Sequence, residues 1–428
     1  MSTYHYRCFH CKTRFNLSEI ERQLSYLCPN CGKSEKNQPL QGVLLIEYDY
    51  EGLKKEYNRS FFLNLPSGQF WRYPGLWPLK RNETENAPPF RNISWREIFS
   101  LILPSHKLHS TKLENREVLI FDDTNNPTCS YKDRASILVA LKAKQRGLSD
   151  ISAASTGNAG SSLAGICARL GLTARLWVPE EIPEAKLLQM LAYGAQIHLV
   201  KGNYDEAYDL CLEISRQSGW YNRNTAYNPL TIEGKKSGAY DIFLEMKGNL
   251  PKYIFVPVGD GVVLAGIYKG FWELHQLGVI KSLPRLIAVQ SRGSDALVRY
   301  LATGRFEYHP PDTLADSISA GAPRNLFMAA HAIRESGGFA VAVEDGEIVE
   351  AQKRIAREMG ILVEPAAAAS LAGFLKVQEK LDLSGGGKAL FIFSGSGLKD
   401  LDSLKRLYRY PMALAPEIWR ERFARAHS

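Results

Sequence analysis

The chain has 428 residues, too many for one small hydrophobic core, and this length indicates two or three domains. Hydrophobic residues make up 45% and charged residues 23%, as in ordinary globular proteins, and no apolar run approaches the length of a membrane span. The formal net charge of +8 is spread without a block of like charge, so it favours anionic small ligands at least as much as nucleic acid. Because the N-terminus has no apolar signal core, we expect a cytoplasmic protein with reduced thiols and no membrane partner.

Two Cys-x-x-Cys pairs, Cys8 with Cys11 and Cys28 with Cys31, stand near the N-terminus. Two such pairs on facing turns supply four thiolates in a tetrahedron, which is the geometry that zinc prefers. A closed four-sulfur site leaves no open position for a substrate, so we predict a structural Zn²⁺ and a zinc ribbon over residues 1–42. A redox role for these pairs would need a thioredoxin-like βαβ context, which this segment lacks.

The remaining residues, 43–428, are predicted to form one catalytic body with a smaller subdomain at roughly 140–245. From residue 117 onward, strand and helix patterns alternate. Strands are predicted at 118–121, 151–155, 174–178, 196–200, 253–258, 286–290, 339–343 and 389–393. Helices are predicted from Lys132 to Gly147, at 161–170, 184–193, 204–217, 264–277, 348–359 and 366–378, and in the closing segment 401–428. This alternation predicts an α/β fold with parallel sheets covered on both faces, which bind ligands at the carboxyl ends of their strands.

Lys132 stands at the first of these strand-to-helix junctions. A lysine held at such a turn can lose its water contacts, lower its pKa and form a Schiff base with a carbonyl group. A solvated lysine at a helix start is the common alternative. The loops after the other strands decide between the two interpretations.

Three other loops carry polar groups at strand ends. Ser155-Thr156-Gly157-Asn158 offers hydroxyls, an amide and backbone N–H groups at a helix start, which suits a carboxylate, although a simple helix cap would use the same residues. Gly259-Asp260-Gly261-Val262-Val263 lets backbone amides approach one phosphate, but Leu264 breaks the dinucleotide fingerprint. Ser394 places a hydroxyl after the strand 389–393. A reactive lysine, a carboxylate site, a phosphate site and a strand-end hydroxyl together fit pyridoxal 5'-phosphate.

On these motifs the chain resembles the threonine synthases, within the fold type II (tryptophan synthase β-like) pyridoxal phosphate enzymes. The run 126–134 resembles their lysine motif, which implies that Lys132 attaches the cofactor and then acts as a base. The asparagine loop implies that Asn158 bonds the cofactor's ring hydroxyl and that the substrate is bound by Ser155, Thr156 and Gly157. The resemblance assigns Gly259, Asp260, Gly261, Val262 and Val263 to the cofactor phosphate, and Ser394 to the pyridine nitrogen.

The resemblance further implies two α/β domains with the cofactor between them and a homodimer. It implies a lyase that converts O-phosphohomoserine and water into threonine and phosphate, so the partner is a small, phosphorylated amino acid. Lys235, Lys236 and Arg324 are candidates for binding its phosphate. The chain departs from the family pattern at Cys129, where glycine is usual, and at Asp260, where asparagine is commoner. The family's Gly-Glu-Gly-x-Thr-Pro-Leu segment has no counterpart, and residues 105–113 occupy that stretch.

Two alternatives stay open from the sequence. A serine/threonine dehydratase or a β-replacement synthase of a specialised pathway would use the same cofactor on another substrate. A non-catalytic ribbon protein that binds nucleic acid is permitted by the basic composition, but no stripe of basic and aromatic residues supports it.

Overall fold

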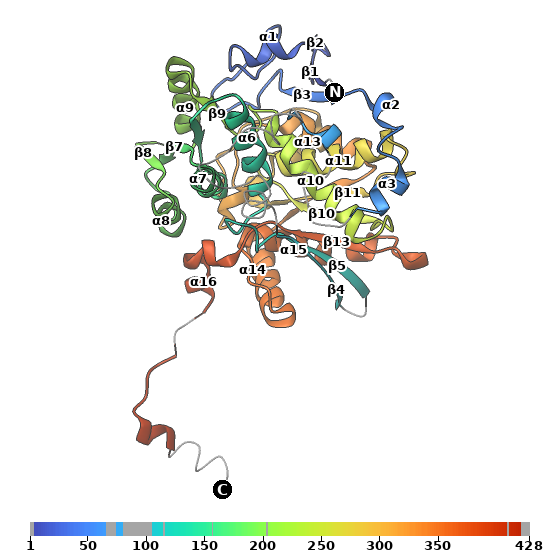
Figure 1. Ribbon diagram of the computed structural model, residues 1–428. Helices are drawn as coiled ribbons and strands as arrows, with labels where there is room; N and C mark the ends of the chain where they lie inside the picture. Colours follow the sequence, from blue (N-terminus) through green and yellow to red (C-terminus); the bar gives the residue numbers. More distant parts are fainter. Residues whose placement is uncertain are drawn as a thin grey trace.

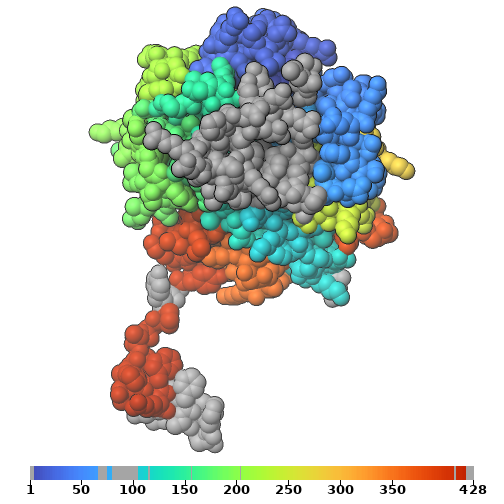
Figure 2. Space-filling model, viewed as in Figure 1, coloured from blue at the N-terminus to red at the C-terminus, as the bar shows by residue number. Residues whose placement is uncertain are grey.

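The computed structural model describes residues 4–65, 74–79, 105–113, 116–155, 157–202, 204–408 and 411–420. Two helix-covered sheets form the body, and a small N-terminal sheet caps one end of it (Figures 1 and 2). The chain beyond α16 (Leu401–Leu407) projects from the opposite end. None of the helices in the described ranges is both long and apolar enough to cross a membrane.

The N-terminal cap is an antiparallel sheet in the order β2-β1-β3, formed by β1 (Tyr4–Cys8), β2 (Arg14–Phe15) and β3 (Leu44–Tyr48). The short helix α1 (Leu17–Glu21) follows β2. Because β3 pairs with the whole of β1, this sheet extends past residue 42, where we expected the ribbon to end. The chain then enters the body through α2 (Tyr50–Leu53), α3 (Arg59–Leu63) and η2 (Pro74–Leu76).

The larger sheet has the strand order β12-β11-β10-β13-β5-β4. Its strands are β4 (Lys107–Leu113), β5 (Arg116–Asp122), β10 (Tyr253–Pro257), β11 (Arg285–Ser291), β12 (Phe339–Val343) and β13 (Ala389–Phe393). All neighbouring pairs are parallel except β4 with β5, so the predicted parallel sheet carries one antiparallel edge strand. β4 lies within the stretch 105–113, where this chain has no counterpart of the family's Gly-Glu-Gly-x-Thr-Pro-Leu segment, and the sequence did not predict it as a strand. β10 and β13 are buried along their whole length, as expected for strands covered on both faces.

The smaller sheet is parallel throughout, in the order β8-β7-β6-β9. Its strands are β6 (Asp150–Ala154), β7 (Thr173–Pro179), β8 (Gln196–Val200) and β9 (Tyr221–Asn222). The helices that alternate with them are α7 (Asn158–Leu170), α8 (Glu184–Ala192) and α9 (Tyr204–Ser218). This sheet lies inside the segment 140–245 that we expected to form the smaller subdomain.

The helices of the larger sheet include three that the sequence did not predict. They are α10 (Leu230–Glu245), α12 (Ala296–Thr303) and α13 (Leu326–Glu335). Every residue from Leu230 to Leu244 is buried, so α10 has no solvent-exposed face. Its sequence therefore lacks the amphipathic stripe by which surface helices are recognised. The predicted helices are confirmed as α6 (Asp133–Gln145), α11 (Val262–Gln276), α14 (Asp345–Arg354) with η5 (Ile355–Met359), α15 (Pro365–Val377) and α16.

Candidate active site

The loops at the carboxyl ends of both sheets meet around one cavity of about 260 Å³. Of the residues predicted to bind the cofactor or the substrate carboxylate, it brings together all but one: Lys132, Ser155, Gly157, Asn158, Gly259, Asp260, Gly261, Val262, Val263 and Ser394. The exception, Thr156, lies outside the described residues. Loops that the sequence could only propose one by one therefore share a single ligand-sized space, as strand ends do in α/β folds.

Lys132 occupies the N-cap position of α6, at the strand-to-helix junction where we predicted it. Its side chain is only partly exposed and lines the cavity. Burial lowers the pKa of its ammonium group, and the positive charges of Arg223 and Lys186 act in the same direction, whereas Glu364 opposes them. A lysine in these surroundings can present a neutral, nucleophilic amine.

The loop before Lys132 is fixed by backbone contacts. The N–H of Tyr131 donates to the carbonyl oxygen of Ser394 at 2.9 Å, which joins this loop to the end of β13. The carboxylate of Asp133 accepts from the backbone N–H of Thr128 at 2.7 Å and from its hydroxyl at 2.5 Å. Cys129 has φ +64°, a left-handed conformation that favours glycine, which explains why glycine is usual at this position in the resembling motif.

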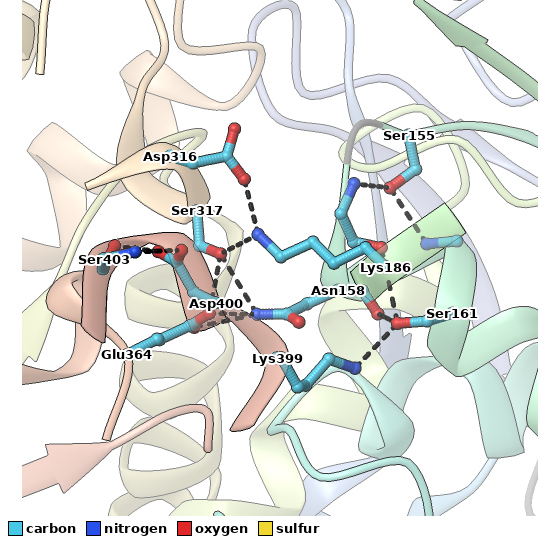
Figure 3. A network of polar contacts seen from close by, with 12 residues as sticks. Ser155, Asn158, Ser161, Lys186, Asp316, Ser317, Glu364, Lys399, Asp400 and Ser403 are labelled. Carbon is cyan, nitrogen blue, oxygen red and sulfur yellow. Dashed lines mark hydrogen bonds and ion pairs between the residues drawn. The ribbon is translucent and has the colours of Figure 1, made fainter. Parts of the chain in front are cut away.

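Asn158 connects the two sheets through its amide (Figure 3). Its Nδ2 donates to both carboxylate oxygens of Glu364, at 2.8 and 2.9 Å, and to the hydroxyl of Ser317 at 3.1 Å. Its Oδ1 is buried and has no partner among the described residues. The amide nitrogen is therefore held by protein groups, and the oxygen is the atom of Asn158 that can meet a ligand.

Ser155 caps the start of α7 as well as lining the cavity. Its Oγ accepts from the backbone N–H of Gly157 at 3.1 Å and of Gly160 at 2.9 Å. The backbone N–H of Gly157 therefore already has an acceptor within the loop. The hydroxyl hydrogen of Ser155 can still be donated to a bound carboxylate.

Lys186 is a buried cation beside this loop that the sequence did not single out. Its ammonium group donates to Asp316 at 2.5 Å and to Ser317 at 3.4 Å (Figure 3). A Cβ atom added to Gly157 would lie 3.2 Å from its Nζ. The ammonium group of Lys186 therefore lies close to this loop. It could bind a substrate carboxylate there while it stays paired with Asp316.

The backbone N–H groups of residues 259–263 have no acceptor among the described residues. Gly261 has φ +85°, and a Cβ on Gly259 would come within 2.8 Å of the Cα of Ile318, so both positions require glycine. The carboxylate of Asp260 accepts from the backbone N–H of Arg324 at 3.2 Å. Burial raises the pKa of the Asp260 carboxyl group, and the Arg324 segment supplies it with a hydrogen-bond donor beside the loop.

Ser394 lies at the carboxyl end of β13, nearly buried, and lines the cavity. Its Oγ has no hydrogen-bond partner among the described residues, whereas its carbonyl oxygen is used by Tyr131. This leaves a neutral hydroxyl available to a ring nitrogen.

Among the residues that the structure describes, three arginines are fully buried, and they differ in their partners. Arg134 pairs with Asp123 and Asp241, and Arg324 pairs with Asp205. Arg223 has no ion pair within the described chain. Its Nη1 donates to the hydroxyl of Thr225 at 3.0 Å, but its Nε and Nη2 have no partner. Burial lowers the pKa of its guanidinium to about 10, so an uncompensated cation sits behind Thr225, which lines the cavity.

Lys235 of α10 is a second buried cation without a described partner, and it lines the same cavity. Burial lowers its pKa well below the ordinary value, and the charges of Arg223 and Lys132 lower it further. Lys236 does not line this cavity. Its Nζ pairs with Glu233 at 2.6 Å and with Glu273 at 2.9 Å, so the prediction that it binds a phosphate is wrong. Sequence reasoning missed Arg223 because it follows a strand of only two residues.

The four N-terminal cysteines converge, with their Sγ atoms all within 4.8 Å of one another. The Sγ atoms of Cys8 and Cys31 are 3.4 Å apart, and those of Cys11 and Cys28 are 3.6 Å apart. Zinc–sulfur bonds of about 2.3 Å in a tetrahedron place the sulfur atoms roughly 3.8 Å apart. The cluster therefore has the ligand set and spacing of a closed four-sulfur zinc site.

The comparison with protein families identifies the class of enzyme to which the chain belongs. The family model described as "Pyridoxal-phosphate dependent enzyme" matches residues 100–395. The chain belongs to this family of pyridoxal-phosphate-dependent enzymes, and the non-catalytic alternative is thereby excluded for its body.

Among curated proteins, the chain is similar over nearly its whole length to threonine synthases. It is 34% identical to that of Methanocaldococcus jannaschii, covering 95% of this chain and 96% of the relative. It is 31% identical to that of Methanosarcina acetivorans, covering 93% and 92%. Among solved structures, the processed form of threonine deaminase isoform 2 from Solanum lycopersicum has a TM-score of 0.58 at 22% identity, covering 68% of this chain and 77% of that one. O-ureido-L-serine synthase has a TM-score of 0.61 at 18% identity, covering 76% and 98%. These structural likenesses establish the fold.

Pyridoxal phosphate fits the residues that are present. The cavity offers a lysine with a lowered pKa, unpaired N–H groups in the loop 259–263, and the free Oγ of Ser394. Pyridoxal phosphate requires an attachment lysine, a phosphate site and a partner for its ring nitrogen, and these groups could serve as each.

Proposed function

We propose that the protein is a threonine synthase, which converts O-phosphohomoserine and water into threonine and phosphate. Similarity to threonine synthases over 92–96% of their length supports this activity. The fold alone would serve a dehydratase or a β-replacement synthase equally well, so the substrate has to be argued from the cavity.

We propose that Lys132 attaches the cofactor and, once released by the substrate amine, moves the α-proton. Pyridoxal phosphate, when bound, supplies the electron sink for this chemistry. The lowered pKa of Lys132 supports the role, because a general base must be neutral near working pH. Ser394, a neutral partner for the ring nitrogen, suits elimination and replacement chemistry. The remaining proposed contacts are Asn158 to the ring hydroxyl through Oδ1, the loop Gly259 to Val263 to the cofactor phosphate, and Ser155, Thr156 and Gly157 near the substrate carboxylate.

The choice of a phosphorylated substrate rests on one observation, the two buried basic side chains of Arg223 and Lys235, which have no acidic partner among the described residues. A buried guanidinium without an acidic partner is costly to fold, and a bound anion removes the cost. The two unpaired nitrogens of Arg223, Nε and Nη2, form one edge of the guanidinium, which suits two oxygens of a phosphate in geometry and charge. We propose that these two residues bind the substrate phosphate, and that Arg324, whose guanidinium already pairs with Asp205, does not.

Phosphate release tests this function directly. The protein, loaded with pyridoxal phosphate, is offered O-phosphohomoserine, O-phosphoserine, serine and threonine, with product amino acids measured alongside phosphate. We expect threonine and phosphate in equal amounts from O-phosphohomoserine alone. Ammonia and a keto acid from serine or threonine, without turnover of O-phosphohomoserine, would instead establish the dehydratase.

We further propose that the cysteines bind a structural Zn²⁺, and that the protein is a cytoplasmic homodimer. The sulfur geometry supports the metal, and the absence of disulfides among the seven cysteines fits a reducing compartment. The division into a ribbon, a body and a smaller subdomain at roughly 140–245 stays a prediction. Metal analysis and light scattering test the stoichiometry of one zinc per chain and two chains per particle.

A further inference from the structure

We propose that the cysteine cluster and the phosphate loop of the cavity are energetically coupled through Arg324. Metal bound by the ribbon strengthens the binding of pyridoxal phosphate in the cavity, and the cofactor slows the loss of the metal. The inference rests on the proposed function, because it assumes that zinc and this cofactor occupy their sites.

The second cysteine pair fixes a hairpin in the ribbon. The N–H of Cys28 donates to the carbonyl oxygen of Gly42 at 2.8 Å, and Lys33 and Gln41 exchange two backbone hydrogen bonds of 3.1 Å. Gly42 has φ +69°, and a Cβ there would lie 2.6 Å from the Cα of Gly32. The chain between Lys33 and Gly42 is therefore positioned by the turn that carries Cys28 and Cys31.

Backbone atoms of this hairpin form hydrogen bonds with both the backbone and the guanidinium group of Arg324. The N–H of Leu40 donates to the carbonyl oxygen of Arg324 at 3.2 Å, and the Nη1 of Arg324 donates to the carbonyl oxygen of Gln38 at 3.3 Å. Arg324 and Leu40 are fully buried, so water cannot readily replace the contact between them, whereas Gln38 lies at the exposed edge of the hairpin. The position of residues 38–40 therefore determines where Arg324 can lie.

Arg324 also contacts two residues that line the cavity. Its backbone N–H donates to Asp260 at 3.2 Å, within the loop 259–263, and its Nη2 pairs with Asp205 at the start of α9. The N–H of the next residue, Asn325, donates to the carbonyl oxygen of Asp260 at 2.9 Å. The guanidinium lies over the ring of Tyr208 at 4.6 Å. A shift of Arg324 would thus move the phosphate loop and release the acidic side chain of Asp260.

Loss of the metal removes the cross-link between the two cysteine pairs and with it the constraint on residues 33–42. In the metal-free ribbon, the contacts of Gln38 and Leu40 with Arg324 must also offset the conformational entropy lost by ordering this hairpin, so they are weaker. Arg324 is then held less firmly, and Asp260 loses the positioned N–H donor to its carboxyl group. Binding linkage is reciprocal, so the factor by which zinc raises cofactor affinity equals the factor by which the cofactor raises zinc affinity.

Zinc release to a chromogenic chelator gives a readout that does not depend on activity. We expect the protein loaded with pyridoxal phosphate to release zinc several-fold more slowly than the cofactor-free protein, and inorganic phosphate alone to give a smaller effect. Arg324→Met should remove the difference, whereas Arg292→Met, at an exposed ion pair with Glu344, should retain it. Cofactor affinity of wild-type protein with and without zinc must change by the same factor as its equilibrium zinc affinity with and without the cofactor, measured by competition with the chelator, and this comparison keeps the test valid if Arg324→Met does not fold.

Equal zinc-release rates with and without the cofactor in the wild-type protein would overturn the coupling. If that protein also makes threonine from O-phosphohomoserine, only the coupling is wrong and the proposed function stands. A protein that binds no pyridoxal phosphate, or no zinc, refutes the coupling together with the corresponding part of the proposed function.

Discussion

Replacing Arg223 by methionine should make the cofactor-free protein more stable and less active. Methionine keeps most of the length of the side chain but removes two guanidinium nitrogens, Nε and Nη2, that have no partner. Each unpaired buried polar group costs about 1–3 kcal/mol, and the hydrogen bond to Thr225 that is also lost contributes about 1 kcal/mol. The free energy of unfolding of Arg223→Met should therefore rise by about 1–5 kcal/mol, measured by urea unfolding without cofactor.

The same substitution should weaken use of the phosphorylated substrate. Hydrogen bonds to charged groups contribute about 1.5–3 kcal/mol each, and two such bonds to a phosphate correspond to a loss of at least about 100-fold in kcat/KM. The assay is phosphate release from O-phosphohomoserine at saturating cofactor. Cofactor affinity, titrated separately, should stay within a few-fold of wild type.

Arg134→Met is the matched control, because Arg134 is equally buried but pairs with Asp123 and Asp241. Breaking those pairs leaves buried carboxylates uncompensated and should cost about 3–5 kcal/mol of stability. If Arg223→Met destabilises the protein as Arg134→Met does and leaves kcat/KM intact, Arg223 is a structural residue and the reasoning fails. A loss of cofactor affinity instead would assign Arg223 to the cofactor phosphate.

Three further outcomes are expected. Lys132→Ala should abolish the visible absorbance of lysine-bound cofactor, and borohydride reduction followed by peptide mapping should place the adduct of the wild-type protein on Lys132; an adduct on another lysine would refute the assignment. Burial lowers the pKa of Lys399 to about 8 from its ordinary 10.5, so between these values the unfolded chain holds a proton that the folded protein has released. Stability should therefore rise with pH across this window, by up to about 3 kcal/mol, and unfolding of Lys399→Met should lack that part of the rise; an unchanged pH slope would contradict it. Cys11→Ser should lower the zinc content measured by metal analysis, and full zinc occupancy would exclude the four-sulfur site.

Much of the fold could be predicted from local patterns. Period-two and apolar runs marked the strands β5 to β8 and β10 to β13, and glycines marked the ends of most helices between them. The strand ends then located Lys132, Asn158, the loop 259–263 and Ser394, because parallel sheets bind ligands at that edge. Local patterns did not predict α10. This helix is buried on every face, so its sequence has no periodic alternation of apolar and exposed polar residues.

The sequence by itself determined the chemistry that depends on residue type and short spacing. Four cysteines in two knuckles, a lysine before a helix and a glycine-flanked loop are properties of contiguous chain, and they indicate zinc and pyridoxal phosphate. Only the tertiary structure decided which polar groups have partners. Asn158 and Glu364 form hydrogen bonds although they are 206 positions apart in the chain. Arg134 and Arg223 are equally buried, but only Arg134 is paired with carboxylates. Burial and pairing are set by packing between distant segments, and no local pattern encodes whether a buried charge is compensated.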